Sequence, residues 1–115
     1  MTTIEAIKSS RDHWRRMLRA VILNLYWLVE NRNINGKTLK EICGESWSSD
    51  YCELCEQFIC YYCPLGLIKG VCTSTRSPYS KVTDSKTWPE FIRSSERMIM
   101  WLNECLIAEI VKEAA

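Results

Sequence analysis

The sequence predicts a mainly α-helical fold in which two long antiparallel helices and a short helix are joined by an irregular, zinc-stapled, cysteine-rich loop. Three observations lead to it. Apolar residues recur at helical spacing near both ends of the 115-residue chain, no helical or strand period holds over residues 46–86, and that aperiodic segment contains five of the seven cysteines. A chain of this length is expected to form a single domain over residues 1–115.

The first long helix is predicted within residues 1–35. Thr2 and Glu5 form a capping-box pattern at its start, and the asparagines and glycine of residues 31–36 end it. The apolar residues behind the cap follow steps of three, four or seven: Ile4, Ile7, Trp14, Leu18, Val21, Leu25 and Leu28. Four more widen this stripe in the second half: Met17, Ile22, Tyr26 and Val29. We therefore expect the second half to be the more deeply buried one.

Two further helices are predicted, a short one over residues 37–44 and a long one over residues 87–115. Thr38 with Glu41 forms a second capping box and Gly44 ends the short helix, while Thr87 with Glu90 starts the long one. Its buried stripe is predicted to contain Phe91, Ile92, Ile99, Leu102, Leu106 and Ile110. Because each long helix is apolar on one side only, the two are expected to pack against each other.

The cysteine-rich segment, residues 46–86, is predicted to be held by a metal ion. Its cysteines follow the order Cys52-x2-Cys55-x4-Cys60-x2-Cys63-x8-Cys72. A two-residue gap lets both thiolates of a pair face one ion, and zinc prefers four such ligands. The predicted ligands are Cys52, Cys55, Cys63 and Cys72, with Cys60 as an alternative ligand; the four from Cys52 to Cys63 form an alternative set. A site closed by protein ligands leaves no position open for catalysis.

Two other interpretations of the cysteines stay open. The spacing Cys55-x4-Cys60-x2-Cys63 opens the ligand pattern of plant-type ferredoxins and allows an iron–sulfur cluster, although their last ligand lies much further on than Cys72. Disulfides are the third interpretation. Zinc is favoured over disulfides because the chain begins without a secretory-signal pattern and carries an odd number of cysteines. We accordingly expect a cytoplasmic protein.

The remaining residues with chemical potential have simpler interpretations. Cys43 and Cys105 lie among apolar helical positions and are expected to be core residues. His13, the only histidine, is expected at the helix surface or partly buried, acting neither as a metal ligand nor as a catalytic partner of a cysteine. The aromatic residues near the cysteines are interpreted as a small core around the metal, with a binding surface as the alternative: Trp47, Tyr51, Tyr61, Tyr62 and Tyr79.

Basic residues gather on the first helix, at spacings that place most of them on one face: Lys8, Arg11, Arg15, Arg16 and Arg19. This face is either a solvated helix surface or a site that binds phosphates or an acidic partner. The net charge of +1 supplies no global field towards nucleic acid or membrane. The longest apolar run, residues 20–29 with Asn24 inside it, is shorter than the roughly 20 residues of a membrane-spanning helix, so no membrane partner is expected.

Several short motifs occur together in order along the chain: His13-Trp14, Cys52-Glu53-Leu54-Cys55, Cys63-Pro64-Leu65, Gly70-Val71-Cys72 and Pro78-Tyr79. This pattern resembles a family of small, uncharacterised cysteine-rich proteins encoded by bacteriophages and prophages. The family has no established activity, so the resemblance transfers no catalytic residue. It implies a viral accessory protein, and proteins of that kind commonly act by binding a protein of the host.

The leading functional hypothesis is therefore a non-enzymatic protein with a structural zinc that binds and inhibits a host protein in the host cytoplasm, with a component of antiviral defence as the candidate target. One histidine and three aspartates allow few acid–base constellations. The alternative is a nucleic-acid-binding zinc protein that uses the basic face of the first helix. A redox or iron–sulfur protein acting through Cys60 and Cys63 ranks third.

Overall fold

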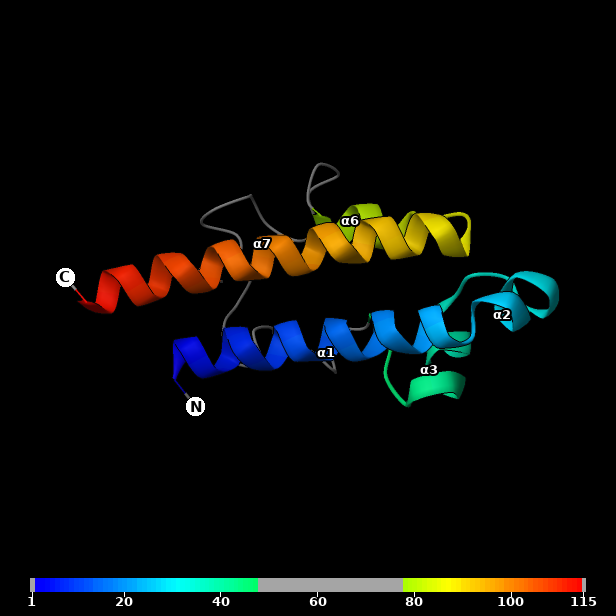
Figure 1. The fold of residues 1–115 in the computed structure, drawn as a ribbon, viewed down its shortest axis with the longest axis horizontal. Helices are drawn as coiled ribbons and strands as arrows, with labels where there is room; N and C mark the ends of the chain where they lie inside the picture. The colour runs from blue at the N-terminus through cyan, green and yellow to red at the C-terminus, as the bar shows by residue number, and fades with distance from the viewer. Residues whose placement is uncertain (1, 48–77, 115) are drawn as a thin grey trace.

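The computed structural model describes residues 2–47 and 78–114, which form five helices and no strand (Figure 1). The helices are α1 (Thr3–Leu23), α2 (Leu25–Asn31), α3 (Gly36–Cys43), α6 (Pro78–Thr83) and α7 (Trp88–Ala114). The prediction of a mainly helical fold is confirmed for these residues. None of the helices in the described ranges is long and apolar enough to cross a membrane.

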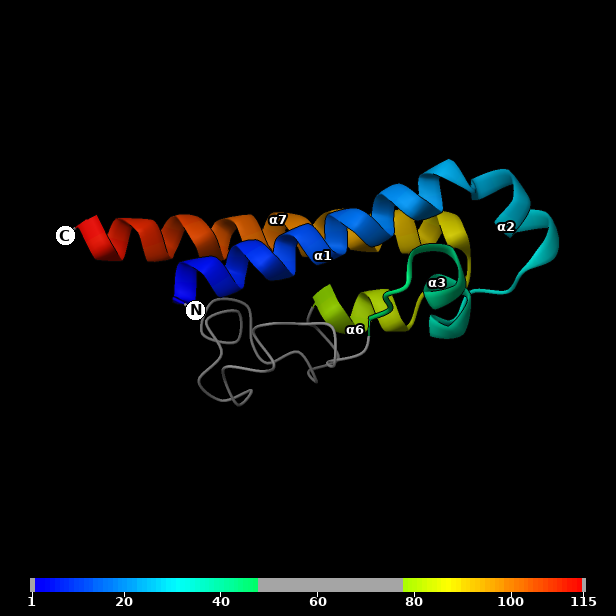
Figure 2. The same ribbon diagram turned by 90° about the horizontal axis from the view of Figure 1, so that it is seen from below.

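The long helices α1 and α7 lie side by side and run in opposite directions, as the sequence predicts (Figures 1 and 2). The short helices α3 and α6 lie on one side of this pair, where α3 packs against α1 and α6 against α7 (Figure 2). One hydrophobic core joins the helices, and its largest fully buried side chains are Trp14, Trp101 and Phe91. The two long helices therefore form the frame to which the other elements are attached.

Local side-chain bonds fix the helix ends, mostly where the sequence predicts them. Thr2 Oγ1 accepts the Glu5 N–H at 3.1 Å, and Thr87 Oγ1 accepts the Glu90 N–H at 3.2 Å. Gly44 ends α3 with a φ of 78°, a left-handed conformation that favours glycine. The predicted capping box of Thr38 with Glu41 is wrong.

The helix α3 begins two residues earlier than Thr38. The Asn35 side chain accepts the Thr38 N–H at 2.8 Å, so Asn35 is the N-cap, and Thr38 is itself buried. Asparagine and threonine both favour the N-cap position, and here the asparagine occupies it.

The first long helix is interrupted at Asn24, which the sequence did not predict. Its side-chain Nδ2 donates to the Ala20 carbonyl at 2.7 Å, and the chain continues as the separate helix α2. The expectation that this half is more deeply buried is wrong, because Ile22, Tyr26 and Val29 are all exposed. The only buried residue of α2 is Leu28.

Two further differences concern the second half of the chain. Residues 78–83, inside the segment predicted to be irregular, form α6, which begins with a proline as helices tolerate and buries Val82 completely. Ile110, predicted in the buried stripe of the last helix, is 47% exposed. The reason is geometric, since the C-terminal end of α7 extends past the N-terminal end of α1, which would otherwise cover it (Figures 1 and 2).

Candidate functional site

Two aromatic residues of the cysteine-rich segment, Trp47 and Tyr79, are held together at one place on the core. The Tyr79 hydroxyl donates a hydrogen bond to the Trp47 carbonyl at 2.6 Å. The Trp47 ring lies 6.1 Å from the Phe91 ring, and Tyr79 meets the edge of Trp14 with ring centroids 6.2 Å apart. Residues 47 and 79 thus lie side by side on the core. We call Trp47, Tyr79, Glu45, Arg16 and His13 the base cluster.

Within the base cluster, Glu45 binds the stretch after α3 to α1. Its carboxylate accepts two hydrogen bonds from Arg16, from Nε at 2.8 Å and from Nη2 at 2.6 Å. Nδ1 of His13 lies 3.2 Å from Oε1 of the same carboxylate. The hydrogen bonds from Arg16, and to a smaller extent the one from His13, hold the pKa of Glu45 below its ordinary value. Glu45 is therefore an anion with three donors, all from α1.

His13 lies deeper than the sequence predicts. The residue is 1% exposed, so the expectation of a surface or partly buried histidine is wrong. Because a carboxylate only accepts hydrogen bonds, the contact with Glu45 requires a proton on Nδ1. The ring also packs edge-on against Trp14, with centroids 5.6 Å apart. This histidine therefore joins the core and the base cluster.

Cys43 lies next to the base cluster but has the properties of a structural thiol. Its Sγ lies 3.3 Å from the Leu39 carbonyl oxygen and 3.5 Å from that of Glu45 and donates towards them. Burial raises the pKa of the Cys43 thiol, so the protonated form is favoured and a thiolate nucleophile is not. Cys43 is partly buried against the core and Cys105 is fully buried, in line with the prediction that both are core residues.

The predicted metal ligands, Cys52, Cys55, Cys63 and Cys72 with Cys60 as the alternative, lie outside the described residues, as do Tyr51, Tyr61 and Tyr62. Among residues 2–47 and 78–114, no three histidine, cysteine or acidic side chains are grouped so that they could hold a metal ion. The zinc site therefore stays a prediction. The structure does place Trp47 and Tyr79, the two described aromatic residues of that group, against the core.

The predicted basic face of α1 divides into two groups. Arg11 donates to Asn103 on α7 at 3.4 Å, and Arg16 is bound to Glu45 in the base cluster, so both serve the packing of helices. Lys8, Arg15 and Arg19 are exposed, and Arg15 approaches Asp12 only at 3.8 Å. Three of the five basic residues thus remain available to a partner.

Exposed apolar side chains gather where the sequence predicts burial. We call five residues at the end of α1 and on α2 the α2 patch: Ile22, Leu23, Tyr26, Trp27 and Val29. Tyr26 is 90% exposed and Leu23 is 73% exposed. A second exposed group lies on α7: Met100, Ile107, Ile110 and Val111. Contiguous patches of apolar side chains on a protein surface usually mark a site of interaction with a partner.

Comparisons with known proteins do not assign this fold or this base cluster to a family. No protein-family model, curated protein or solved structure matches the chain. The resemblance to the cysteine-rich proteins of bacteriophages therefore stays a prediction based on the motifs alone.

Proposed function

We propose that the chain is a non-enzymatic protein-binding module whose α2 patch docks onto a partner protein. The single observation that carries this proposal is the exposure of the α2 patch between residues 22 and 29. Tyrosine and tryptophan are over-represented among the residues that dominate binding energy at protein interfaces. Burying side chains of this size on a partner supplies a driving force that scales with the apolar area removed from water.

The charges beside the α2 patch indicate the chemistry of the partner. Arg19 precedes the patch and Arg32 follows it, and both are exposed. The Arg32 guanidinium lies 4.7 Å from the centre of the Trp27 ring, a cation–π contact that presents charge and aromatic surface together. The exposed Glu30 also borders the patch, so we propose a partner with an apolar surface that carries charged groups of both signs at its edge. We further propose that this partner is a host protein of antiviral defence and that the chain inhibits it; this part of the proposal is based on the resemblance to phage proteins.

Two features support a non-enzymatic role. The only histidine of the chain is buried and bound to Glu45, and the Cys43 thiol has a raised pKa. We further propose that Cys52, Cys55, Cys63 and Cys72 hold a structural zinc ion, on the strength of their spacing. The bond between Tyr79 and Trp47 supports this part of the proposal, because it brings the flanks of the cysteine segment together and so lowers the entropic cost of closing the segment around an ion.

Binding of nucleic acid is the second candidate, favoured by the exposure of Lys8, Arg15 and Arg19 on α1. If the chain binds nucleic acid, its affinity for the nucleic acid should fall steeply with salt concentration, because the phosphates release counterions when they are bound. Charge reversal at Arg15 and Arg19 should then abolish binding, which fluorescence anisotropy with a labelled oligonucleotide would measure. Loss of binding without salt dependence would contradict this candidate.

The protein-binding proposal is tested with two matched double variants. Leu23→Ser with Tyr26→Ser removes the centre of the α2 patch, while Ile107→Ser with Val111→Ser removes a comparable exposed pair on α7. The readout is a stoichiometric complex with a partner isolated from a bacterial lysate and then reconstituted from pure components. We expect the first variant to lose the complex and the second to retain it. Equal binding by both, or self-association through the α2 patch alone, would contradict the proposal.

A further inference from the structure

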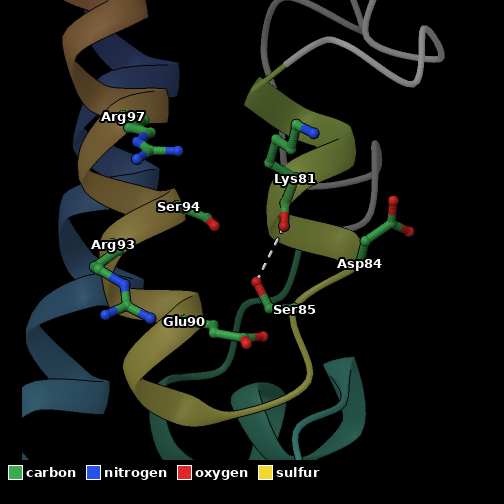
Figure 3. A pocket seen from close by; sticks show the side chains of 7 residues that line it. All are labelled: Lys81, Asp84, Ser85, Glu90, Arg93, Ser94 and Arg97. Atoms are coloured by element: carbon green, nitrogen blue, oxygen red, sulfur yellow. Dashed lines mark hydrogen bonds between the residues drawn. The ribbon is translucent and has the colours of Figure 1, made fainter.

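A groove between α6 and α7 is lined by more basic than acidic side chains. It has a volume of about 280 Å³. Its lining combines three basic, two acidic and two hydroxyl side chains: Lys81, Asp84, Ser85, Glu90, Arg93, Ser94 and Arg97. Arg97 and Ser94 point from α7 towards α6, and Lys81 lies opposite them on α6 (Figure 3).

The three cations of the groove are Lys81 on α6 and Arg93 and Arg97 on α7. In the part of the chain that the structure describes, neither the Lys81 ammonium nor the guanidinium groups of Arg93 and Arg97 form an ion pair or a side-chain hydrogen bond. This differs from α1, where Arg11 and Arg16 bind Asn103 and Glu45. Arg93 and Arg97 are four residues apart on one helix, a spacing at which like charges repel.

The two acidic residues of the lining offset the three cations only in part. One oxygen of the Glu90 carboxylate accepts the Lys86 N–H at 2.7 Å at the start of α7. Asp84 projects from α6 on the side away from α7 (Figure 3). The part of the groove around Arg97, Ser94 and Lys81 therefore has an excess of donors and of positive charge, and a bound anion would relieve the repulsion between the cations.

From this arrangement we propose that the groove binds the phosphate group of a small phosphorylated molecule. Arginine offers a planar fork of N–H donors that matches phosphate oxygens, lysine adds a compact charge, and the Ser94 hydroxyl adds a neutral donor. The volume of about 280 Å³ lies just below the roughly 300–1,000 Å³ of most small-molecule pockets. The groove accommodates a phosphate with a small substituent, so a monoester is the class of ligand it fits. The proposal is independent of the α2 patch.

The test titrates the intact protein with inorganic phosphate and with glycerol phosphate, a monoester, against sodium chloride of equal ionic strength. Backbone amide chemical shifts locate the binding. We expect saturable shifts at Ser85 and Ser94 with both phosphates and none with chloride. A tighter interaction with glycerol phosphate identifies the monoester as the ligand, whereas equal affinities identify free phosphate.

Three variants separate the groove from general electrostatics. Arg97→Gln and Ser94→Ala alter the groove, whereas Lys112→Gln removes one exposed positive charge from the last turn of α7. We expect Arg97→Gln to weaken phosphate binding about tenfold or more, because it removes charge-assisted hydrogen bonds, and Lys112→Gln to leave it unchanged. Equal losses in the Arg97 and Lys112 variants would overturn the proposal. So would binding of an oligonucleotide by a protein that binds neither phosphate probe, since the groove would then recognise a nucleic-acid backbone.

Discussion

Replacing Glu45 by glutamine tests whether the base cluster stabilises the fold. The change keeps the size of the side chain and removes the charge that accepts hydrogen bonds from Arg16 and His13. The bond to His13 is protected from water, because the histidine side chain is 2% exposed and the Glu45 side chain 19%. The Arg16 side chain is 57% exposed, so its ion pair is screened and contributes less than about 1 kcal/mol.

Together these interactions imply a loss of about 1–2 kcal/mol for Glu45→Gln, since hydrogen bonds to charged groups contribute roughly 1.5–3 kcal/mol and the amide retains part of the bonding. For a domain of this size that corresponds to a fall in Tm of about 4–8 °C. The assay is urea and thermal unfolding followed by circular dichroism at pH 7. The matched control is Glu41→Gln, whose carboxylate is 47% exposed and 3.8 Å from Arg32, and which should change stability by less than about 0.5 kcal/mol.

The same pair of variants predicts a pH dependence. The pKa of Glu45 is lowered in the folded state, so its contribution is fully present above the unfolded pKa of about 4.3 and is lost as pH falls through the lower, folded pKa. The stability difference between the native protein and Glu45→Gln should therefore be constant near neutral pH and shrink in acid. Equal stability of Glu45→Gln and Glu41→Gln at pH 7 would refute the reasoning.

Three further predictions concern the core, the base cluster and the metal. Ser95→Ala should raise the free energy of unfolding by about 1 kcal/mol in urea titrations, because the buried Ser95 hydroxyl has no hydrogen-bond partner among residues 2–47 and 78–114; destabilisation would contradict this. Tyr79→Phe should lower the free energy of unfolding by about 1 kcal/mol and speed proteolysis between residues 48 and 77, because it removes the hydrogen bond to Trp47. Tyr26→Phe, at a position that is 90% exposed, should do neither, and equal behaviour of the two variants would contradict the role of the Tyr79 bond. Elemental analysis should find one zinc per chain, and a chelator should lower the Tm; iron or no metal would refute the zinc site.

Helix positions were predictable because the signals that set them are local. The capping residues Thr2 and Thr87 bond to backbone groups three residues away, and Gly44 adopts a conformation that its own lack of a side chain permits. The pairing of α1 with α7 was predictable as well, since each helix has one apolar side. Asn24 shows the limit of this reasoning, because its side chain bonds to Ala20 and its position inside an apolar run gave no sign of a helix end.

Contacts between distant parts of the chain were not predictable from local patterns. Glu45 lies 32 residues from His13 in sequence, and nothing in the residues adjacent to either one indicated their contact. The exposure of Ile22, Tyr26 and Val29 could not be foreseen, because helical spacing shows which residues share a face and not whether another helix covers it. The groove depends on α6, whose six residues are too few to give a helical period.

The hydrogen bond from Tyr79 to Trp47 also has a consequence for protein engineering and for sequence variation. Because residues 47 and 79 are neighbours in space, the chain between them must begin and end at one place on the core. A variant that lengthens, shortens or replaces this stretch is compatible with the present positions of α3 and α6 only if its new ends meet at the same spacing. The Tyr79–Trp47 pair therefore sets the geometric requirement for any engineered exchange between these two residues.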